Sequence, residues 1–533
     1  MQRILSLGTR QLRSFGKDQS PIPIKPINIY VGKNSCGKST FLRTFPLLRQ
    51  SIQANTKSPI LWFGDLVDFG DFDTALHDGG KEISFDFETE LEIYDHEDVW
   101  DFSSVGISVE PLTRANKKYI YNTKVCISIS KVAEKQLKTR LSFVVNNSAI
   151  EIIYSGDSVE SVIAKNTKYE KEFEFSAKLV TEHGSLFPLR VRGLREIKST
   201  NDLKHFTLTN PFQSEAIAHL TKHLSSYHHG SKKSNRLRTE CETLSILPHG
   251  DLRRKIGHLF SRDKYFQKLF ETEYEEITDI SFTILLAKGL DRLLASADKL
   301  FSNFFSGVRY QGPLRAAGER FYRYQDLRVD EVDHTGGNLP MVIHSLDSAE
   351  KSRLSRWILE NFGFELKLLS NGLHYELLIR EDDDTRFHNI SDMGFGYSQV
   401  LPVIVSIWLE FVSDSRARKV KLSKQSAPRI IVLEQPELHL HPALQYKFGR
   451  SLAKVINKTK RADLYFVIET HSKHLIDAIG ESIRENEVPA SVINITLFEK
   501  QENGITHTQI SGFDDEGYLI NWPVGFLSPE YDY

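Results

Sequence analysis

The chain has 533 residues, 40% of them hydrophobic and 26% charged, which are ordinary values for a globular protein with a sizeable core. Its formal net charge is −2, so any site for a polyanion must be a local patch. No apolar run approaches the roughly 20 residues that span a bilayer, and the three cysteines show no disulfide or zinc pattern. We therefore expect a cytoplasmic protein with no membrane partner.

The predicted elements change character along the chain. Strands at residues 4–7 and 27–31 precede a glycine-rich loop and a helix. Alternating, β-branched segments follow from about residue 81 and predict an antiparallel sheet. Helical spacing then runs from about residue 211, and a second α/β unit begins near residue 310. We expect four parts: a first lobe at 1–80, an antiparallel β-rich part of that lobe at 81–205, a helical insert at 206–308, and a second lobe at 309–533.

The glycine-rich loop carries the most specific motif in the chain. Gly32-Lys33-Asn34-Ser35-Cys36-Gly37-Lys38-Ser39 matches G-x-x-x-x-G-K-[ST] at every fixed position, and Thr40 continues it as a helix. Glycines let backbone N–H groups surround phosphates, and the helix N-terminus adds a favourable dipole. Lys38 is predicted to reach the β- and γ-phosphates of ATP, and the Ser39 hydroxyl to help hold Mg²⁺.

A late apolar strand predicts the acidic counterpart of this loop. Residues 430–433 are all aliphatic, and Glu434 follows directly. A carboxylate at that edge of a sheet is where a P-loop enzyme needs its second Mg²⁺ contact, so Glu434 joins Ser39 as a predicted metal ligand. Another apolar strand, at 465–468, leads to Thr470-His471-Ser472.

Together, the loop, the run at 433–442 and Thr470-His471-Ser472 resemble the ABC ATPases of the recombination and repair type, and related ATPases of bacterial anti-phage systems. The resemblance implies an α/β fold: an ABC-type P-loop ATPase head with an antiparallel β subdomain and a helical insert. It also implies a head-to-tail dimer, with ATP between one P-loop and the partner's signature motif. On this mapping Glu434 is the Walker B acid, and His471 is the switch histidine that senses the γ-phosphate.

The signature is expected before Glu434, and residues 392–402 occupy that place. They depart from the usual Leu-Ser-Gly-Gly-Gln, so the residue that meets the γ-phosphate stays open. Gly394, Gly396, Ser398 and Gln399 are the candidates. A glycine-rich turn before an apolar helix favours the role, because it exposes N–H donors at a helix N-terminus.

The position after the Walker B acid, which in the common pattern holds a catalytic glutamate, is Gln435 here. An amide can hold a water molecule but cannot accept its proton, and loss of a general base costs about 10²–10⁴ in rate. We therefore expect slow hydrolysis. Glu437 is a possible substitute, although Pro436 fixes the backbone between them. The alternative is that Gln435 is the normal residue of this subfamily and that turnover is merely modest.

Residues 62–70, 310–315 and 517–526 resemble one bacterial branch of this class, the PtuA family of ATPase subunits from Septu and Septu-like retron defence systems. The resemblance implies a homodimer or a higher even-numbered oligomer, and a separately encoded HNH-type nuclease. In retrons it adds a reverse transcriptase with its RNA–DNA product. The alternative function is a DNA-repair or recombination ATPase that clamps DNA.

Three further features bear on partners. Only about 60 residues follow His471, too few for a nuclease domain, so we expect no intrinsic nuclease. Basic residues cluster at 228–238 and again at 416–429, where each could contact nucleic-acid phosphates, a protein partner or only solvent. His439 and His441 have a metal-like spacing without an evident third ligand, and on the family resemblance they fall in its D-loop region.

Overall fold

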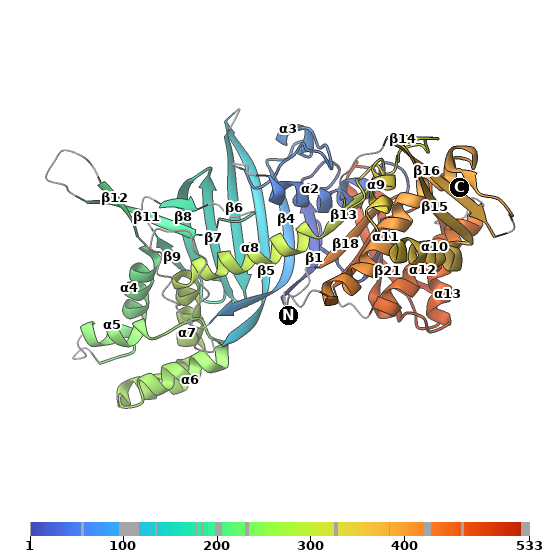
Figure 1. Ribbon diagram of the computed structural model, residues 1–533. Helices are drawn as coiled ribbons and strands as arrows, with labels where there is room; N and C mark the ends of the chain where they lie inside the picture. The colour runs from blue at the N-terminus through green and yellow to red at the C-terminus, as the bar shows by residue number, and fades with distance from the viewer. Residues whose placement is uncertain are drawn as a thin grey trace. The chain divides into compact units, whose positions relative to one another are not determined.

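The computed structural model describes residues 2–54, 58–94, 117–133, 136–175, 179–182, 186–188, 190–197, 205–209, 211–229, 234–323, 329–382, 384–419, 428–459 and 463–523. It divides the chain into two compact units (Figure 1). Unit 1 comprises Met1–Gln11, Ser51–Leu61 and Asp78–Ser302, and unit 2 comprises Leu12–Gln50, Trp62–His77 and Asn303–Tyr533. Both units are therefore assembled from separate stretches of sequence.

Unit 1 is built on a large antiparallel sheet with the strand order β12-β11-β10-β8-β7-β6-β5-β4-β1, and β9 pairs with β8. Its strands are β1 (Arg3–Arg10), β4 (Glu82–Tyr94), β5 (Lys118–Ala133), β6 (Gln136–Val145), β7 (Ser148–Ser155), β8 (Ser158–Asn166), β9 (Lys171–Phe175), β10 (Leu179–Glu182), β11 (Arg190–Ile197) and β12 (His205–Thr209). Side chains alternate along β4, where Phe85 and Phe87 are buried and Asp86 is half-buried between them. This period of two gives the sheet one apolar face that must be covered.

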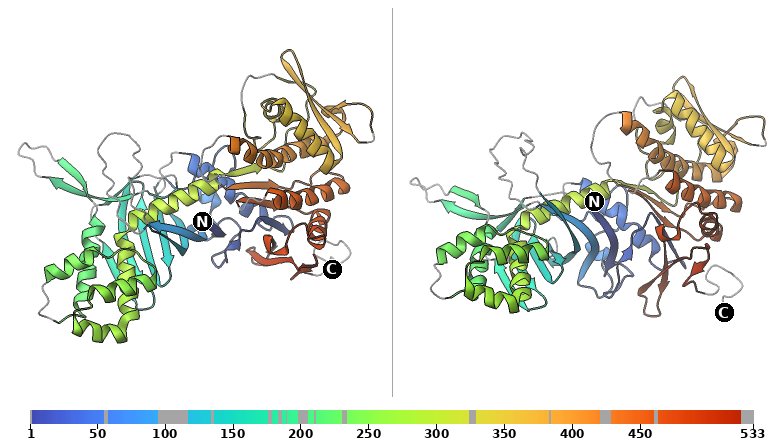
Figure 2. Two further views of the ribbon diagram at one scale, coloured as in Figure 1. Left: turned by 60° about the horizontal axis from the view of Figure 1, so that its bottom comes forward. Right: turned by 90° about the horizontal axis from the view of Figure 1, so that it is seen from below.

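Helices from the later part of unit 1 pack beside the sheet. They are α4 (Pro211–Ser225), α5 (Ser234–Glu242), α6 (His249–Leu259), α7 (Lys264–Lys288) and α8 (Leu290–Ser306). Of these, α4, α7 and α8 contact the strands of the sheet, and α5 and α6 pack on α4 and α7. Figure 2 shows these helices gathered beside the sheet. The Thr283 hydroxyl of α7 is 2.7 Å from the Ser148 hydroxyl of β7 and accepts a hydrogen bond from the Asn166 amide of β8. Phe301 of α8 packs edge-on against Phe87 of β4.

Unit 2 is an α/β structure around a second sheet with the order β13-β18-β19-β3-β20-β21-β22. The strands of unit 2 are β2 (Ile22–Pro23), β3 (Ile27–Gly32), β13 (Val308–Gln311), β14 (Tyr322–Arg323), β15 (Phe364–Asn371), β16 (His374–Glu381), β17 (His388–Asn389), β18 (Arg429–Glu434), β19 (Leu464–Glu469), β20 (Ile493–Lys500), β21 (Thr506–Phe513) and β22 (Leu519–Ile520). Of these, β14, β16 and β15 form a separate small sheet in that order, and β17 pairs with β16. Its helices are α1 (Lys38–Leu42), α2 (Thr44–Gln53), α3 (Phe72–Ala75), α9 (Leu339–His344), α10 (Ser348–Phe362), α11 (Phe395–Lys419), α12 (Pro442–Thr459) and α13 (Lys473–Arg484).

The parallel strands of this sheet fix where its functional residues meet. Strands β13, β18, β19, β3 and β20 run parallel, and β3, the middle strand of the seven-stranded sheet, is fully buried. A strand buried on both faces needs a continuous apolar run, which residues 430–433 supply. Because parallel strands end at the same edge, Gly32, Glu434 and Glu469 all lie at the carboxyl edge of the sheet.

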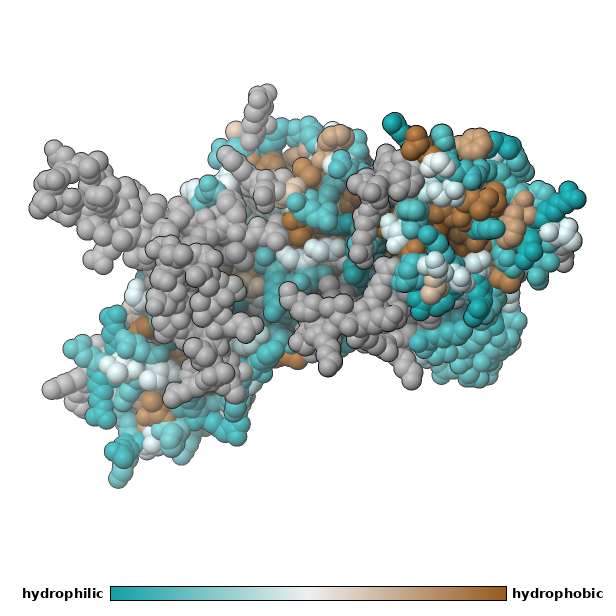
Figure 3. Space-filling view, in the orientation of Figure 1, coloured by the Kyte–Doolittle hydropathy of each residue, from teal (hydrophilic) through white to brown (hydrophobic). Residues whose placement is uncertain are grey.

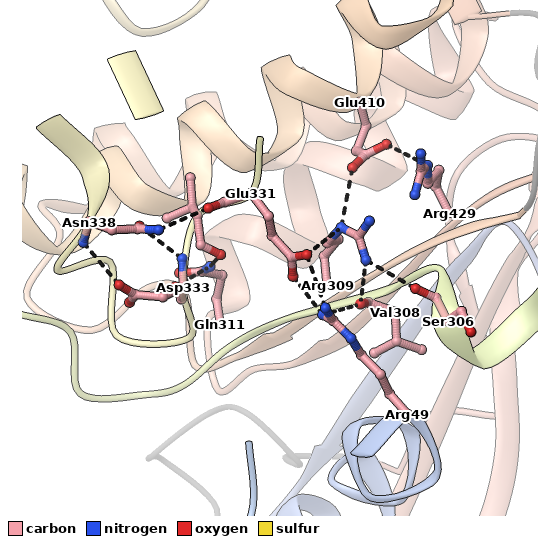
Figure 4. Close-up of polar contacts among 11 residues, drawn as sticks. Arg49, Ser306, Val308, Arg309, Gln311, Glu331, Asp333, Asn338, Glu410 and Arg429 are labelled. Carbon is pink, nitrogen blue, oxygen red and sulfur yellow. Dashed lines mark hydrogen bonds and ion pairs between the residues drawn. The ribbon is translucent and has the colours of Figure 1, made fainter. Parts of the chain in front are cut away.

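An ionic network joins four elements of unit 2 (Figure 4). Arg49 of α2 makes a two-pronged contact with Glu331, at 2.5 and 3.0 Å. Arg309 of β13 lies 3.3 Å from Glu331 and 3.8 Å from Glu410 of α11, and Glu410 in turn lies 3.1 Å from Arg429 of β18. Burial lowers the pKa of Arg309, and the two glutamates oppose that effect. The network therefore compensates charges that the fold takes out of water.

Two sequence expectations concern residues that the structure describes only in part. Lys232 and Lys233 of the first basic patch, and Lys421 and Lys424 of the second, lie outside the described residues. Residues 524–526 of the third family segment also lie outside them. Within the described ranges, no helix is both long enough and apolar enough to cross a membrane.

Unit 1 should lose stability in mild acid through His223 of α4. Burial lowers the pKa of His223 to about 4 from 6.5, and among the described residues its buried Nε2 has no hydrogen-bond partner. The unfolded chain therefore binds this proton more tightly, so the stability present above pH 6.5 is lost as pH falls toward 4. By linkage the loss is about 2 to 3 kcal/mol between pH 7.5 and pH 4.5.

Urea denaturation at the two pH values checks this prediction. His223→Leu should lose less stability than wild type over the same interval, because it has no proton to take up. His258→Leu, at an exposed position of α6, is the matched control and should behave as wild type. Equal pH dependence in His223→Leu and wild type would contradict the assignment.

Candidate nucleotide-binding site

The loop at residues 32–39 folds as a tight backbone cradle between β3 and α1. Gly37 has φ +98° and Ser35 has φ 61°, both in the left-handed region that glycine tolerates best. A Cβ added to Gly32 would lie 2.3 Å from the Phe498 carbonyl oxygen, and one added to Gly37 would lie 2.7 Å from the Thr506 hydroxyl. The loop tip at residues 33–35 is exposed, while Cys36 is buried beneath it.

The two functional side chains of the loop point into the sheet edge. The Lys38 ammonium is buried and donates to the carbonyl oxygens of Gly32 and Lys33, at 3.0 and 2.8 Å. The Ser39 hydroxyl, one residue later and next to Thr40 on α1, donates to Glu469 Oε1 at 2.9 Å. The same carboxylate oxygen is 3.9 Å from Lys38 Nζ. Lys38 and Ser39 are thus gathered around Glu469, the last residue of β19.

Glu434, the predicted Walker B acid, has different partners. Its two oxygens accept from Arg43 Nε and Nη2 at 2.9 and 2.7 Å, and Oε2 also accepts from the Tyr310 hydroxyl at 2.7 Å. Burial alone would lower the pKa of Arg43, but the hydrogen bond and the charge of Glu434 together have the larger effect and raise the pKa of Arg43. Burial, and then the charge of Glu434, raises the pKa of Tyr310. Glu434 is therefore locked by an arginine and a tyrosine.

Glu469 accepts fewer side-chain hydrogen bonds from the described residues than Glu434 does. It stands opposite Glu434 in the register of β18 and β19. Burial raises its pKa to about 7; the Ser39 hydrogen bond opposes this rise, and the charge of Glu434 adds to it. Its second oxygen, Oε2, is buried and has no hydrogen-bond partner within the described part of the chain. Burying a carboxylate whose second oxygen has no hydrogen bond costs free energy unless a cation approaches it.

Gln435 and Glu437 lie in the loop that follows β18, and His471 lies in the loop that follows β19. Gln435 adopts φ 46°, and its backbone N–H donates to the Glu469 carbonyl at 2.9 Å. Glu437 is buried, which raises its pKa, and its Oε1 accepts from the His471 backbone N–H at 2.7 Å. Burial, and then the charge of Lys38, lowers the pKa of His471, so the ring is neutral near pH 7. The histidine is thus held beside the phosphate loop.

The expected signature lies at the start of α11. Gly394 is exposed with φ +80°, and a Cβ on Gly396 would meet the His439 carbonyl oxygen at 2.8 Å. Ser398 and Gln399 are buried, and the Ser398 hydroxyl donates within the helix to Phe395 at 2.8 Å. A γ-phosphate contact from this turn therefore falls most readily to its exposed backbone around Gly394.

Arg315 joins this turn to β18. The Gln399 amide accepts from the Arg315 N–H and donates to the Arg315 carbonyl, at 3.1 and 3.0 Å. The Arg315 guanidinium then donates to the carbonyl oxygens of Gln399 and Glu434, at 3.3 and 3.2 Å. Burial lowers the pKa of Arg315 to about 10. The Gln399 side chain is thus engaged inside the unit.

The residues present fit a magnesium nucleotide. Three polar atoms around the loop are buried without a partner among the residues that the structure covers: Glu469 Oε2, Glu437 Oε2 and His471 Nε2. The loop supplies backbone donors and an ammonium for phosphates, and Ser39 with the carboxylates supplies the oxygen ligands that Mg²⁺ prefers. By contrast, the described residues contain no group of three or more His, Cys, Asp or Glu placed to hold a metal by themselves, at His439 and His441 or elsewhere.

Four partners of the site were missed by the sequence reasoning: Glu469, Arg43, Tyr310 and Arg315. Glu469 carried the same signal as Glu434, since both acids directly follow an apolar strand. The other three had no local signal, because Arg43 and Tyr310 lie 391 and 124 residues from Glu434. Tyr310 and Arg315 do fall within a segment that was noted for its family resemblance.

Fold and site together define a P-loop ATPase. The model of the AAA ATPase domain family matches residues 12–476, and the chain belongs to that family. The expected α/β fold with an antiparallel β-rich part and a helical part is confirmed, and its assignment to the ABC type stays a prediction. No curated protein matches the chain.

Solved structures with some similarity are heads of Smc proteins. An Smc head domain with an extended coiled coil, bound to the C-terminal domain of ScpA and derived from Pyrococcus furiosus, is 12% identical, with 96% of each chain covered and a TM-score of 0.33. The SMC head domain from Thermotoga maritima is 12% identical, with 95% of this chain and 98% of that chain covered and a TM-score of 0.31. At these values the similarity adds nothing to what the fold itself shows.

The Arg43–Glu434 pair should behave as a coupled unit. Arg43→Met leaves the buried Glu434 carboxylate with Tyr310 alone, and we expect it to lower the free energy of unfolding by about 2 kcal/mol, less than for a fully buried pair because Arg43 is partly exposed. The double variant Arg43→Met, Glu434→Gln removes both charges and should recover more than half of that loss.

Chemical denaturation of the four proteins in this cycle measures the coupling. Lys473→Met, which breaks the exposed Lys473–Asp477 pair of α13, is the control and should cost at most about 1 kcal/mol. If the double variant is as unstable as Arg43→Met alone, the loss does not come from the unpaired carboxylate.

Proposed function

We propose that this ATPase is the ATP-binding, slowly hydrolysing subunit of a bacterial anti-phage defence complex. ATP acts chiefly as a long-lived signal that holds a dimer together, and the complex restrains or triggers a separately encoded HNH-type nuclease. The observation that carries the ATP-dependent part is the convergence of Lys38, Ser39 and Glu469 at the edge of the unit 2 sheet.

Slow hydrolysis is supported by the groups available to activate water. Mg²⁺, when bound, neutralises phosphate charge and helps orient the γ-phosphate. Gln435 can hold a water molecule but cannot take its proton. Glu437 is a carboxylate, yet its Oε1 is engaged by the His471 N–H, and Pro436 separates it from Gln435. The neutral His471 ring, with its free Nε2, suits a sensor of the γ-phosphate.

An ATP-dependent homodimer is supported by apolar side chains beside the signature turn. Leu314 is 76% exposed and Phe395 is 48% exposed. The two segments are neighbours, because Arg315 is bonded to Gln399. Figure 3 shows hydrophobic residues gathered on one face of unit 2, within a more hydrophilic surface. Exposed apolar groups next to backbone donors suit a surface that covers the nucleotide of a second copy.

The defence role is supported by the sequence resemblance to the PtuA family in three segments. One of them borders the site, because Tyr310 and Arg315 contact Glu434. A nuclease partner, and in a retron a reverse transcriptase with its RNA–DNA, follow from that resemblance. The cleavage chemistry then belongs to the partner.

ATP turnover by the purified chain tests the missing base. Gln435→Glu restores a proton acceptor and should raise kcat about 10²-fold or more. Gln501→Glu, the same exchange at an exposed site, is the matched control, and Lys38→Ala is the blank. Glu437→Gln should stay near the wild-type rate. Brisk wild-type turnover that Gln435→Glu does not increase would contradict a missing base, and a large loss in Glu437→Gln would identify Glu437 as the base.

Phage plating tests the defence role. Cells that carry the chain with its neighbouring genes should show fewer plaques than cells with Lys38→Ala, while the exposed Lys473→Ala should protect like wild type. The purified chain alone should leave plasmid DNA intact with Mg²⁺ or Mn²⁺. Absence of protection, combined with salt-dependent binding of duplex DNA by the chain alone, would favour the DNA-clamp alternative.

A further inference from the structure

Two glutamates end neighbouring strands at the nucleotide site, yet their side chains are in different states. Glu434 and Glu469 are register partners in β18 and β19. Glu434 accepts three hydrogen bonds, two from Arg43 and one from Tyr310. Among the described residues, Glu469 accepts one side-chain hydrogen bond, from the Ser39 hydroxyl, and its buried Oε2 has no partner. The two carboxylates are therefore not equivalent candidates for a metal.

The hydrogen bond from Ser39 to Glu469 also prepares the hydroxyl for a cation. A hydroxyl has one proton and two lone pairs. Because the Ser39 proton is directed to Glu469 Oε1, the lone pairs of Ser39 remain free for a metal. The Glu469 side chain is only 2% exposed, so its unpaired oxygen is not satisfied by bulk water. Hydroxyl and carboxylate oxygens side by side are a ligand set that Mg²⁺ favours.

Glu434, by contrast, would have to break existing contacts to reach a metal. Its Arg43 pair is two-pronged, at 2.9 and 2.7 Å, and the carboxylate is almost fully buried. Removing a carboxylate from such a pair leaves a partly buried guanidinium without its counter-charge, which costs free energy. Glu469 requires no such rearrangement.

We propose that Glu469, rather than the expected Walker B acid Glu434, is the carboxylate that binds the nucleotide's Mg²⁺ beside Ser39. Glu434 is then a positioning residue, which holds Arg43 and Tyr310 in place next to the metal site. The assignment rests on the proposed function, in which the loop at residues 32–39 binds Mg²⁺ with ATP.

Binding of Mn²⁺, a spectroscopic substitute for Mg²⁺, tests the assignment without any turnover. Mn²⁺ affinity is measured by electron paramagnetic resonance on the full chain with a non-hydrolysable ATP analogue. Nucleotide binding without metal is measured separately, with a fluorescent ATP analogue in EDTA. Glu469→Gln should weaken Mn²⁺ binding about tenfold or more beyond any change that it causes in metal-free nucleotide binding. Glu434→Gln, the same exchange on the neighbouring strand, should change Mn²⁺ affinity by less than about threefold.

The double variant Arg43→Met, Glu434→Gln keeps the test decisive if a single variant folds poorly, because it removes the ion pair as a unit. It should keep Mn²⁺ affinity close to wild type. Loss of Mn²⁺ binding in Glu434→Gln or in the double variant, with nucleotide still bound in EDTA, would overturn the assignment and return the metal to Glu434. Failure of the wild-type chain to bind the nucleotide at all would instead overturn the proposed function.

Discussion

The pairing of two carboxylates at the ends of adjacent parallel strands constrains the rest of the nucleotide site. Glu434 and Glu469 are both almost fully buried, and like charges this close disfavour each other unless cations compensate them. Arg43 and Tyr310 compensate Glu434, whereas Lys38 and Ser39 approach Glu469 from the phosphate loop. The burial of two neighbouring carboxylates therefore brings together the residues after the P-loop, the edge strand β13 and the central strands. Each carboxylate is compensated by its own set of partners.

The same constraint links the site to the signature turn. Arg315 donates to the carbonyl of Glu434 and is itself held by Gln399, in the first turns of α11. The Glu469 carbonyl accepts from the Gln435 backbone N–H, which holds Gln435 next to the ends of β18 and β19. A shift in the position of either carboxylate can thus be transmitted to α11 through these hydrogen bonds. This arrangement suits a protein in which the presence of nucleotide matters more than its rapid consumption.

Local pattern in the sequence predicted the features that depend on neighbours along the chain. The phosphate loop, the apolar strands at 430–433 and 465–468, and the change from alternating to helical spacing follow from periodicity and turn chemistry, and the α/β fold with its β-rich and helical parts is confirmed. The partners of Glu434 could not be predicted, because Arg43 is brought to it only by the strand order of the sheet. Glu469 was predictable from its position, because it follows an apolar strand as Glu434 does, although the motif Thr470-His471 comes directly after it. The roles of the individual site residues stay predictions.

A structure of the chain with Mg²⁺ and a non-hydrolysable ATP analogue tests the account most directly. We expect the nucleotide on the loop at residues 32–39 of one copy, covered by the turn around Gly394 of a second copy. The metal should lie between Ser39 and Glu469, with Arg43 still on Glu434. A nucleotide bound by a single copy, with that turn facing solvent, would contradict the dimer. A metal on Glu434 with Arg43 displaced would contradict the division of labour between the two carboxylates.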